Sequence, residues 1–266
     1  MTVLVKKPKE ITEWLNRFFI HPLSYFLVGH IKKTAILPNH LSFLGVLSSL
    51  VAAFCLYQAY YSGFFFILSL MFFGLRMIFD AADGQLARAK NLCSENGAII
   101  DGICDYFSFF FIYSAIGYLY YPLYGAAIFL FIALTALSNA LQASSYQLYL
   151  DLYNFVQYRK IGDKLKFITS DKPKGFSILL AIYNRLQLCF LKEESILSLV
   201  KEEPHNKSAS FKQLLPKWHL LALNYRYLLL SLLIKHIMVY FFIEIVLLNF
   251  VLGWLLVRTE RLLYKI

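Results

Sequence analysis

The chain has 266 residues, of which 59% are hydrophobic and only 16% are charged, and its formal net charge is +10. This composition excludes an ordinary water-soluble domain and favours a protein with membrane-spanning helices. Anionic lipid headgroups and the positive-inside rule account for the positive charge, whereas nucleic acid is not an expected partner because no basic motif or aromatic platform accompanies the charge.

Residues 1–36 predict a segment that lies in the membrane interface. Trp14, Phe18 and Phe19 stand among polar residues there, and Pro22 interrupts the pattern. An amphipathic helix at the membrane surface buries such an apolar face in lipid while its polar face stays in water. We therefore expect an N-terminal interfacial amphipathic helix before the first span.

Six apolar stretches follow, and they predict six transmembrane helices in an all-α integral membrane protein. They cover residues 40–61, 63–79, 97–121, 126–150, 220–234 and 237–257. No internal repeat is visible, so we expect a single membrane domain over residues 1–266. Its parts are the interfacial segment 1–36, spans one to four with the candidate site at 37–150, a basic cytoplasmic or interfacial segment at 151–217, and spans five and six with the tail at 218–266.

The orientation follows from the distribution of lysine and arginine. Almost all of them lie in segments that fall on one side of a six-span protein, and the turns at 60–63 and 120–125 carry none. The positive-inside rule makes the basic side cytoplasmic. We expect the cytoplasmic membrane of a bacterium, with the site described next facing the cytoplasm.

An acidic cluster begins where the second span ends. If residues 80–88 continue the helix, about 100° of rotation per residue places Asp80 and Asp83 on one stripe with Gly84 and Ala87. Arg88 stands at the edge of this stripe. The two small residues allow another helix or a ligand to approach closely.

The third span contributes a second acidic face, because Gly97, Asp101 and Asp105 repeat every four residues. Carboxylates in hydrocarbon are costly and repel one another, and a hard divalent cation relieves both costs. Oxygen ligands favour magnesium, manganese or calcium over zinc. Roles as helix caps or interface residues suit one or two of these aspartates better than all four. Arg76, one turn before Asp80, either touches the site or pairs with one of its aspartates.

The spacing of this cluster resembles the signature of the CDP-alcohol phosphotransferase family, also called CDP-alcohol phosphatidyltransferases. Asp80, Asp83, Gly84, Ala87, Arg88, Gly97, Asp101 and Asp105 fill its fixed positions without a gap or substitution. The stretch LPNHLS at 37–42 resembles the Pro-Asn-x-x-Thr/Ser segment of many relatives. The resemblance is clear over residues 20–150.

The resemblance implies transfer of a substituted phosphate from a CDP-linked donor to an alcohol, with release of CMP. It implies two magnesium ions, for which manganese would substitute, bound by Asp80, Asp83, Asp101 and Asp105, with Asp105 also acting as the catalytic general base. The residues expected to contact the donor are Asn39, Ser42, Asp80, Gly84, Ala87, Arg88 and Ser94. Gly97 is expected to be structural, and Ser94 could equally be the cap of the third span.

The substrate branch is left open by these residues. We expect a function in phospholipid biosynthesis, with CDP-diacylglycerol as donor and a small polar acceptor; CDP-inositol and CDP-choline or CDP-ethanolamine are alternative donors within the family. A transporter or an inactive scaffold is the rival from another class. We also expect membrane lipids as partners and a homodimer.

Overall fold

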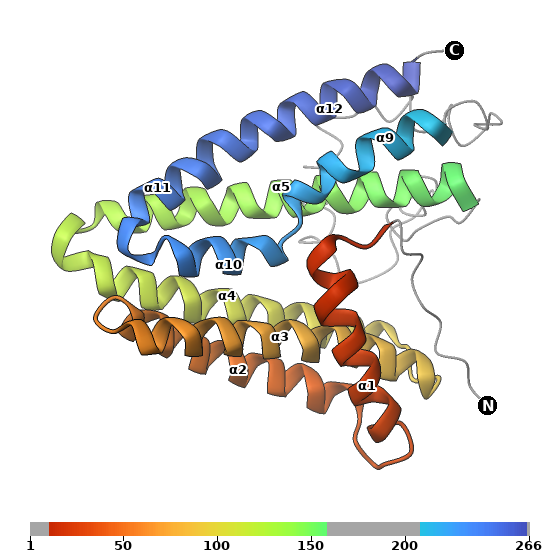
Figure 1. Ribbon diagram of the computed structural model, residues 1–266, viewed down its shortest axis with the longest axis horizontal. Helices are drawn as coiled ribbons and strands as arrows, with labels where there is room; N and C mark the ends of the chain where they lie inside the picture. The colour runs from red at the N-terminus through yellow and green to blue at the C-terminus, as the bar shows by residue number, and fades with distance from the viewer. Residues whose placement is uncertain (1–10, 159–207, 265–266) are drawn as a thin grey trace. The chain divides into compact units, whose positions relative to one another are not determined.

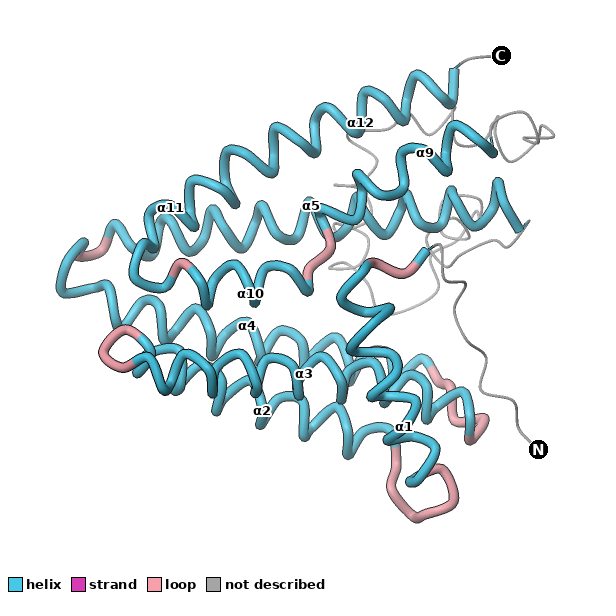
Figure 2. The backbone as a smooth tube through the Cα atoms, in the orientation of Figure 1, coloured by secondary structure: helices cyan, strands magenta, loops and turns pink. Residues whose placement is uncertain are grey.

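The computed structural model describes residues 11–158 and 208–264, and the secondary structure of these residues is entirely helical (Figures 1 and 2). The predicted all-α class is therefore confirmed for the described residues. They form two compact units. The first holds residues 11–132 and Asn224–Tyr240, and the second holds residues 133–158, 208–223 and 241–264. Most of the predicted basic segment, 159–207, lies outside the described residues.

Three long helices make the frame of the first unit: α2 (Pro38–Ala59), α3 (Gly63–Ala89) and α4 (Glu95–Tyr124). α2 packs along both α3 and α4, and the three run side by side in Figure 1. The buried face of α2 is rich in small residues, which let helix backbones approach closely. At Gly45, an added Cβ would lie 3.8 Å from the Cβ of Phe79 and 3.9 Å from the carbonyl oxygen of Arg76.

The N-terminal segment packs onto the outer side of α3. A π-helical turn, η2 (Asn16–Ile20), leads into α1 (His21–Ile31). Gln85 donates a hydrogen bond of 2.7 Å to the Ser24 hydroxyl, and both side chains are buried. Val28 of α1 lies in an apolar cluster with residues of α2 and α3. The amphipathic character and interfacial position predicted for this segment stay predictions.

The second unit is built from α5 (Ala127–Tyr158), which begins in the first unit, α9 (Ser208–Trp218) and α12 (Leu248–Tyr264). Tyr149 stacks on Trp218 with ring centroids 4.8 Å apart, so α5 holds α9 through aromatic contact. Gln142 donates a hydrogen bond of 2.9 Å to the Asn249 side chain, which joins α5 to α12.

Five helices are long and apolar enough to cross a membrane among residues 11–158 and 208–264, which indicates an integral membrane protein. They are Pro38–Ala59, Gly63–Ala89, Ile100–Tyr124, Ala127–Tyr158 and Ile234–Leu263. The first four overlap the predicted spans one to four, with ends that differ by a few residues at most except where the second and fourth helices run on past the prediction. The fifth combines the short elements η5 (Ile234–His236), α11 (Ile237–Phe242) and η6 (Ile243–Leu247) with α12, and it contains the predicted sixth span.

The stretch 220–234, predicted as the fifth span, is not one long helix, so the six-span count is not confirmed. Ala222 has an extended backbone with ψ of 132°, which ends the 3₁₀ turn η4 (His219–Leu221). The helix that follows, α10 (Asn224–Leu232), has nine residues. At about 1.5 Å per residue it is roughly 14 Å long, about half of the hydrocarbon thickness.

Candidate active site

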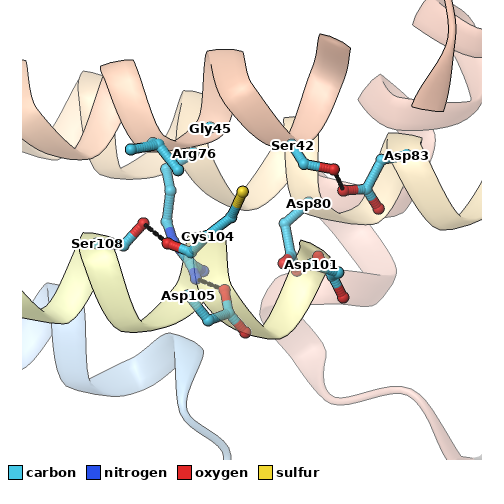
Figure 3. A pocket seen from close by; sticks show the side chains of 10 residues that line it. Ser42, Gly45, Arg76, Asp80, Asp83, Asp101, Cys104, Asp105 and Ser108 are labelled. Carbon is cyan, nitrogen blue, oxygen red and sulfur yellow. Dashed lines mark hydrogen bonds and ion pairs between the residues drawn. The ribbon is translucent and has the colours of Figure 1, made fainter. Parts of the chain in front are cut away.

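The four aspartates of the acidic cluster come together in one pocket of the first unit, as their spacing predicts (Figure 3). α2, α3 and α4 each contribute to its wall. The lining residues are Ser42, Gly45, Val46, Arg76, Asp80, Asp83, Asp101, Cys104, Asp105 and Ser108. The cavity volume is about 10 Å³, close to the space that one water molecule needs. The cavity itself has no room for a ligand as large as a nucleotide.

Asp83 lies on the inner side of the pocket and is held by a hydroxyl group of α2. The Ser42 Oγ donates a hydrogen bond of 2.7 Å to Asp83 Oδ2, and each residue is only 7% exposed. A hydrogen bond from a hydroxyl to a carboxylate is among the stronger neutral-to-charged contacts. Ser42 therefore fixes the direction of one aspartate, which is a different role from the donor contact expected of it.

Asp105 forms an ion pair with Arg76 across the gap between α4 and α3. The Arg76 side chain is 5% exposed and the Asp105 side chain is 40% exposed. The guanidinium is therefore buried, whereas the carboxylate that it contacts is partly open to the outside. Arg76 therefore does both things considered for it, since it lines the pocket and pairs with one of its aspartates. An arginine this deeply buried needs compensating partners, because an unpaired charge in the interior is costly.

Tyr227 of α10 is the second partner of Arg76. The guanidinium carbon lies 5.2 Å from the centroid of the Tyr227 ring, a distance typical of a cation–π contact. The ring also stacks on Phe73 with centroids 5.1 Å apart, and Tyr227 is 2% exposed. The short helix α10 thus supports the arginine that holds Asp105.

Asp80 and Asp101 occupy the middle of the pocket, with their side chains close together in Figure 3. Asp80 is exposed and Asp101 is half-buried. In the described part of the chain, neither is held by a serine or an arginine as Asp83 and Asp105 are, although Asp101 hydrogen-bonds with Asp83. Asp80 is therefore the carboxylate of the pocket with the most exposed position.

The donor groups of the pocket fit a hard divalent cation in chemical type. Carboxylate oxygens are the preferred ligands of magnesium and manganese, and four of them line one cavity. However, no group of three His, Cys, Asp or Glu side chains within residues 11–158 and 208–264 is arranged so that it could hold a metal ion as it stands. The bonds of Asp83 to Ser42 and of Asp105 to Arg76 give a physical reason, since they turn two of the carboxylates towards protein partners.

The other predicted donor-binding residues do not line this cavity. An added Cβ on Gly84 would lie 3.4 Å from an Arg88 guanidinium nitrogen, so the Arg88 side chain lies beside Gly84. Arg88 is exposed and Ala87 is half-buried. Asn39 is exposed on the first turn of α2. Their contacts with a donor stay predictions.

Ser94 caps α4, which confirms one of the two roles considered for it. Its Oγ accepts a hydrogen bond of 3.0 Å from the backbone N–H of Gly97. An added Cβ on Gly97 would lie only 3.2 Å from this Oγ, so a side chain there would crowd the cap. This contact supports the structural role predicted for Gly97.

The sequence interpretation missed Tyr227, and it also missed the pocket-lining residues Gly45, Val46, Cys104 and Ser108. Tyr227 lies far from the aspartates along the chain, within a stretch read as a membrane span. The one available signal was its neighbour Arg226, because a charged residue inside an apolar stretch indicates a helix packed against protein rather than lipid.

Comparison with protein families agrees with the geometry of the pocket. The family model described as CDP-alcohol phosphatidyltransferase matches residues 35–198, which is more than half of the chain and includes the whole acidic motif. The chain belongs to this family, and it is therefore a transferase that uses a CDP-alcohol. A comparison with curated proteins finds no match.

Proposed function

We propose that this protein transfers a phosphatidyl group from CDP-diacylglycerol to a small polar alcohol in phospholipid biosynthesis, with release of CMP. The observation that carries the proposal is the convergence of Asp80, Asp83, Asp101 and Asp105 on one pocket at the ends of two apolar helices. Family membership supports the reaction class.

Two divalent cations, magnesium or manganese, would be held by the four aspartates. When bound, such ions neutralise the pyrophosphate of the donor and stabilise the oxygens that enter and leave at phosphorus. Asp80 and Asp101, which neither Ser42 nor Arg76 holds, lie next to each other in the pocket, and Asp80 is exposed. Asp83 would contribute from the inner side, where Ser42 orients it.

The donor would lie across the mouth of the pocket. Arg88 lies beside Gly84 on the exposed side of α3, so its planar guanidinium could pair with a phosphate that passes over the glycine. Ala87 lies one turn from Asp83 and leaves room for the nucleotide. Asn39, exposed at the start of α2, is the proposed contact for the cytidine end.

Asp105 is the proposed general base. Its carboxylate would accept the proton of the acceptor hydroxyl as the acceptor oxygen forms its bond to the β-phosphorus. The bond between that phosphorus and the bridging oxygen breaks, and CMP leaves with the electron pair. Arg76 holds Asp105 towards the pocket, so the base is oriented before the acceptor arrives.

We propose that the pocket faces the cytoplasm. The loops at the pocket end of α2, α3 and α4 carry Lys32, Lys33 and Lys90. The turns at the other ends, residues 60–62 and 125–126, carry no lysine or arginine. This asymmetry matches the positive-inside rule over the first four spans alone, without any assumption about the later ones. A bacterial cytoplasmic membrane is the proposed location.

The proposal is tested by CMP release from the purified protein in liposomes with magnesium. CDP-diacylglycerol, CDP-inositol, CDP-choline and CDP-ethanolamine would each be offered with a panel of acceptor alcohols. We expect release with CDP-diacylglycerol and one small polar acceptor. Release with a soluble CDP-alcohol and diacylglycerol instead would show that the lipid is the acceptor, and it would contradict the proposed donor.

A further inference from the structure

A second cavity lies in the other unit, between α9 and α12, and it is wide and basic. Its volume is about 390 Å³. It is lined by Ser210, Gln213, Leu214, Lys217, Trp254, Arg258, Arg261 and Leu262. No carboxylate is among these residues, and none of them belongs to the aspartate pocket.

Two of the cations that line this cavity lie close to the ring of Trp254. The Lys217 Nζ lies 5.2 Å from the centroid of the Trp254 ring, and the Arg258 guanidinium carbon lies 5.5 Å from it. Two cations near one ring repel each other, and an anion that contacts both relieves this repulsion. Both cations line the same cavity, so one anion can reach them there.

No carboxylate in the described part of the chain pairs with the cations of the cavity. Within residues 11–158 and 208–264, Lys217, Arg258 and Arg261 form no ion pair with a carboxylate. All three are exposed. Ordinary surface arginines and lysines also remain unpaired. These three differ from them because they line one cavity, Lys217 from α9 and the two arginines from α12.

The frame beneath the cations is well packed. Trp218 of α9 is fully buried, and its indole N–H donates to the Thr259 hydroxyl of α12 at 3.3 Å. Tyr149 of α5 stacks on the ring of this tryptophan. Because these contacts fix α9 against α12, the distance between Lys217 and the two arginines is set by the fold.

The cavity lies near the end of the apolar stretch Ile234–Leu263. Tryptophan and arginine at the end of a span are the residues expected at the level of lipid headgroups. On the same helix, Phe250 is 78% exposed and Val257 is 49% exposed. One ligand that satisfies both surfaces has a phosphate for the cations and hydrocarbon chains for the exposed apolar residues.

We propose that this cavity binds the phosphate of an anionic phospholipid headgroup, with Lys217, Arg258 and Arg261 as its donors and Trp254 as its wall. A free phosphate or a soluble phosphorylated compound would use the cations but leave the apolar surface of α12 without a role. The site is separate in its residues from the aspartate pocket, so this inference does not depend on the proposed substrate.

The test is native mass spectrometry of the full-length protein in mixed micelles that contain equal amounts of phosphatidylglycerol and phosphatidylcholine. The wild-type protein should retain phosphatidylglycerol at least fivefold over phosphatidylcholine. The double variant R258Q/R261Q should bring this ratio close to one. K33Q/K235Q removes two exposed cations elsewhere in the chain and should keep the wild-type ratio.

Two further arms identify the source of the phosphate and the site. Inorganic phosphate at 100-fold excess should leave the retention of phosphatidylglycerol unchanged, and its displacement would show a free-phosphate site and overturn the lipid assignment. An Asp105→Asn variant should retain the lipid as the wild type does. An equal loss of preference in R258Q/R261Q and K33Q/K235Q would overturn the proposal, because general surface charge would then explain the binding.

Discussion

The protein carries two charged cavities among its apolar helices, and they differ in how their charges are held. In the acidic pocket, Asp83 is bonded to Ser42 and Asp105 is paired with Arg76, and the cavity volume is about 10 Å³. In the basic cavity between α9 and α12, Lys217 and Arg258 lie near the Trp254 ring, no cation pairs with a carboxylate in the described part of the chain, and the volume is about 390 Å³.

This difference separates two kinds of site. A small pocket whose side chains are held by polar partners suits catalysis, because the positions of reacting groups must be fixed within fractions of an ångström. A wide cavity lined by exposed cations that form no ion pair in the described part of the chain suits a ligand that is recognised mainly by its charge. If the comparison is correct, changes in the acidic pocket alter turnover and changes in the basic cavity alter lipid retention.

Removal of divalent ions should have the largest effect. Four carboxylates that line one pocket need compensating positive charge before they accept a pyrophosphate, and Arg76 is the one buried cation that lines the pocket. We expect a chelator to abolish CMP release and added magnesium or manganese to restore it. Full activity in excess chelator would contradict the metal-dependent mechanism, and the acidic pocket could then no longer be distinguished from the basic cavity as the catalytic site.

Asp105→Asn should be the most damaging single substitution that leaves the donor site in place. A general base contributes about 10²- to 10⁴-fold to the rate, and the amide cannot take up the proton of the acceptor. We expect CMP release to fall about 10³-fold, with binding of the CDP donor largely retained. Parallel measurement of turnover and of donor affinity checks this.

Glu260→Gln is the matched control for that substitution, since Glu260 is a half-buried carboxylate of α12 outside the acidic pocket. It should leave turnover within about twofold of the wild type, a change worth roughly 0.4 kcal/mol. A collapse of donor affinity in Asp105→Asn would instead make Asp105 mainly a metal ligand.

Ser42→Ala sharpens the claim that polar partners organise the acidic pocket. The change removes the 2.7 Å hydrogen bond to Asp83, and a bond to a charged group is worth about 1.5–3 kcal/mol. We expect kcat/KM to fall about tenfold. Ser49→Ala removes a hydroxyl from the same helix that donates only to the Gly45 carbonyl at 3.0 Å. Equal losses in the two variants would mean that Ser42 serves packing alone.

Substitutions of Tyr227 should have the smallest effect. Its hydroxyl has no hydrogen-bond partner in the described structure, so Tyr227→Phe should stay within about twofold of the wild type. Tyr227→Leu removes the ring beneath Arg76, and the loss of a cation–π contact of about 0.5–2 kcal/mol should lower kcat about three- to tenfold. If Phe and Leu behaved alike in kcat assays, the ring would not position Arg76.

The first four spans and the acidic pocket could be predicted because their signals are local. Each span is one apolar run, and turn-forming residues such as those around Gly63 and Gly125 separate them. The aspartates repeat at intervals of three and four residues, so helix geometry alone places them on shared faces. Convergence in one pocket then follows from the short loop between α3 and α4.

The predicted fifth span was not confirmed because hydropathy does not tell a lipid-facing helix from one that packs against protein. α10 buries Arg226, Tyr227 and Leu230, and it packs against α3. Its apolar residues contact the helix that carries Arg76. The link between Tyr227 and the site depends on this tertiary contact, for which no spacing in the sequence gives a signal. The basic cavity was missed for the same reason, since Lys217 and Arg258 meet only through the packing of α9 on α12.

The most direct test of the central claim is the affinity of the purified protein for CDP, measured with and without magnesium. The wild type should bind CDP in magnesium and lose at least 100-fold in affinity without it, and the double variant D80N/D101N should bind weakly in both conditions. CDP binding of equal strength with and without magnesium, unchanged in D80N/D101N, would contradict the assignment of the four aspartates to a metal-dependent site for the donor.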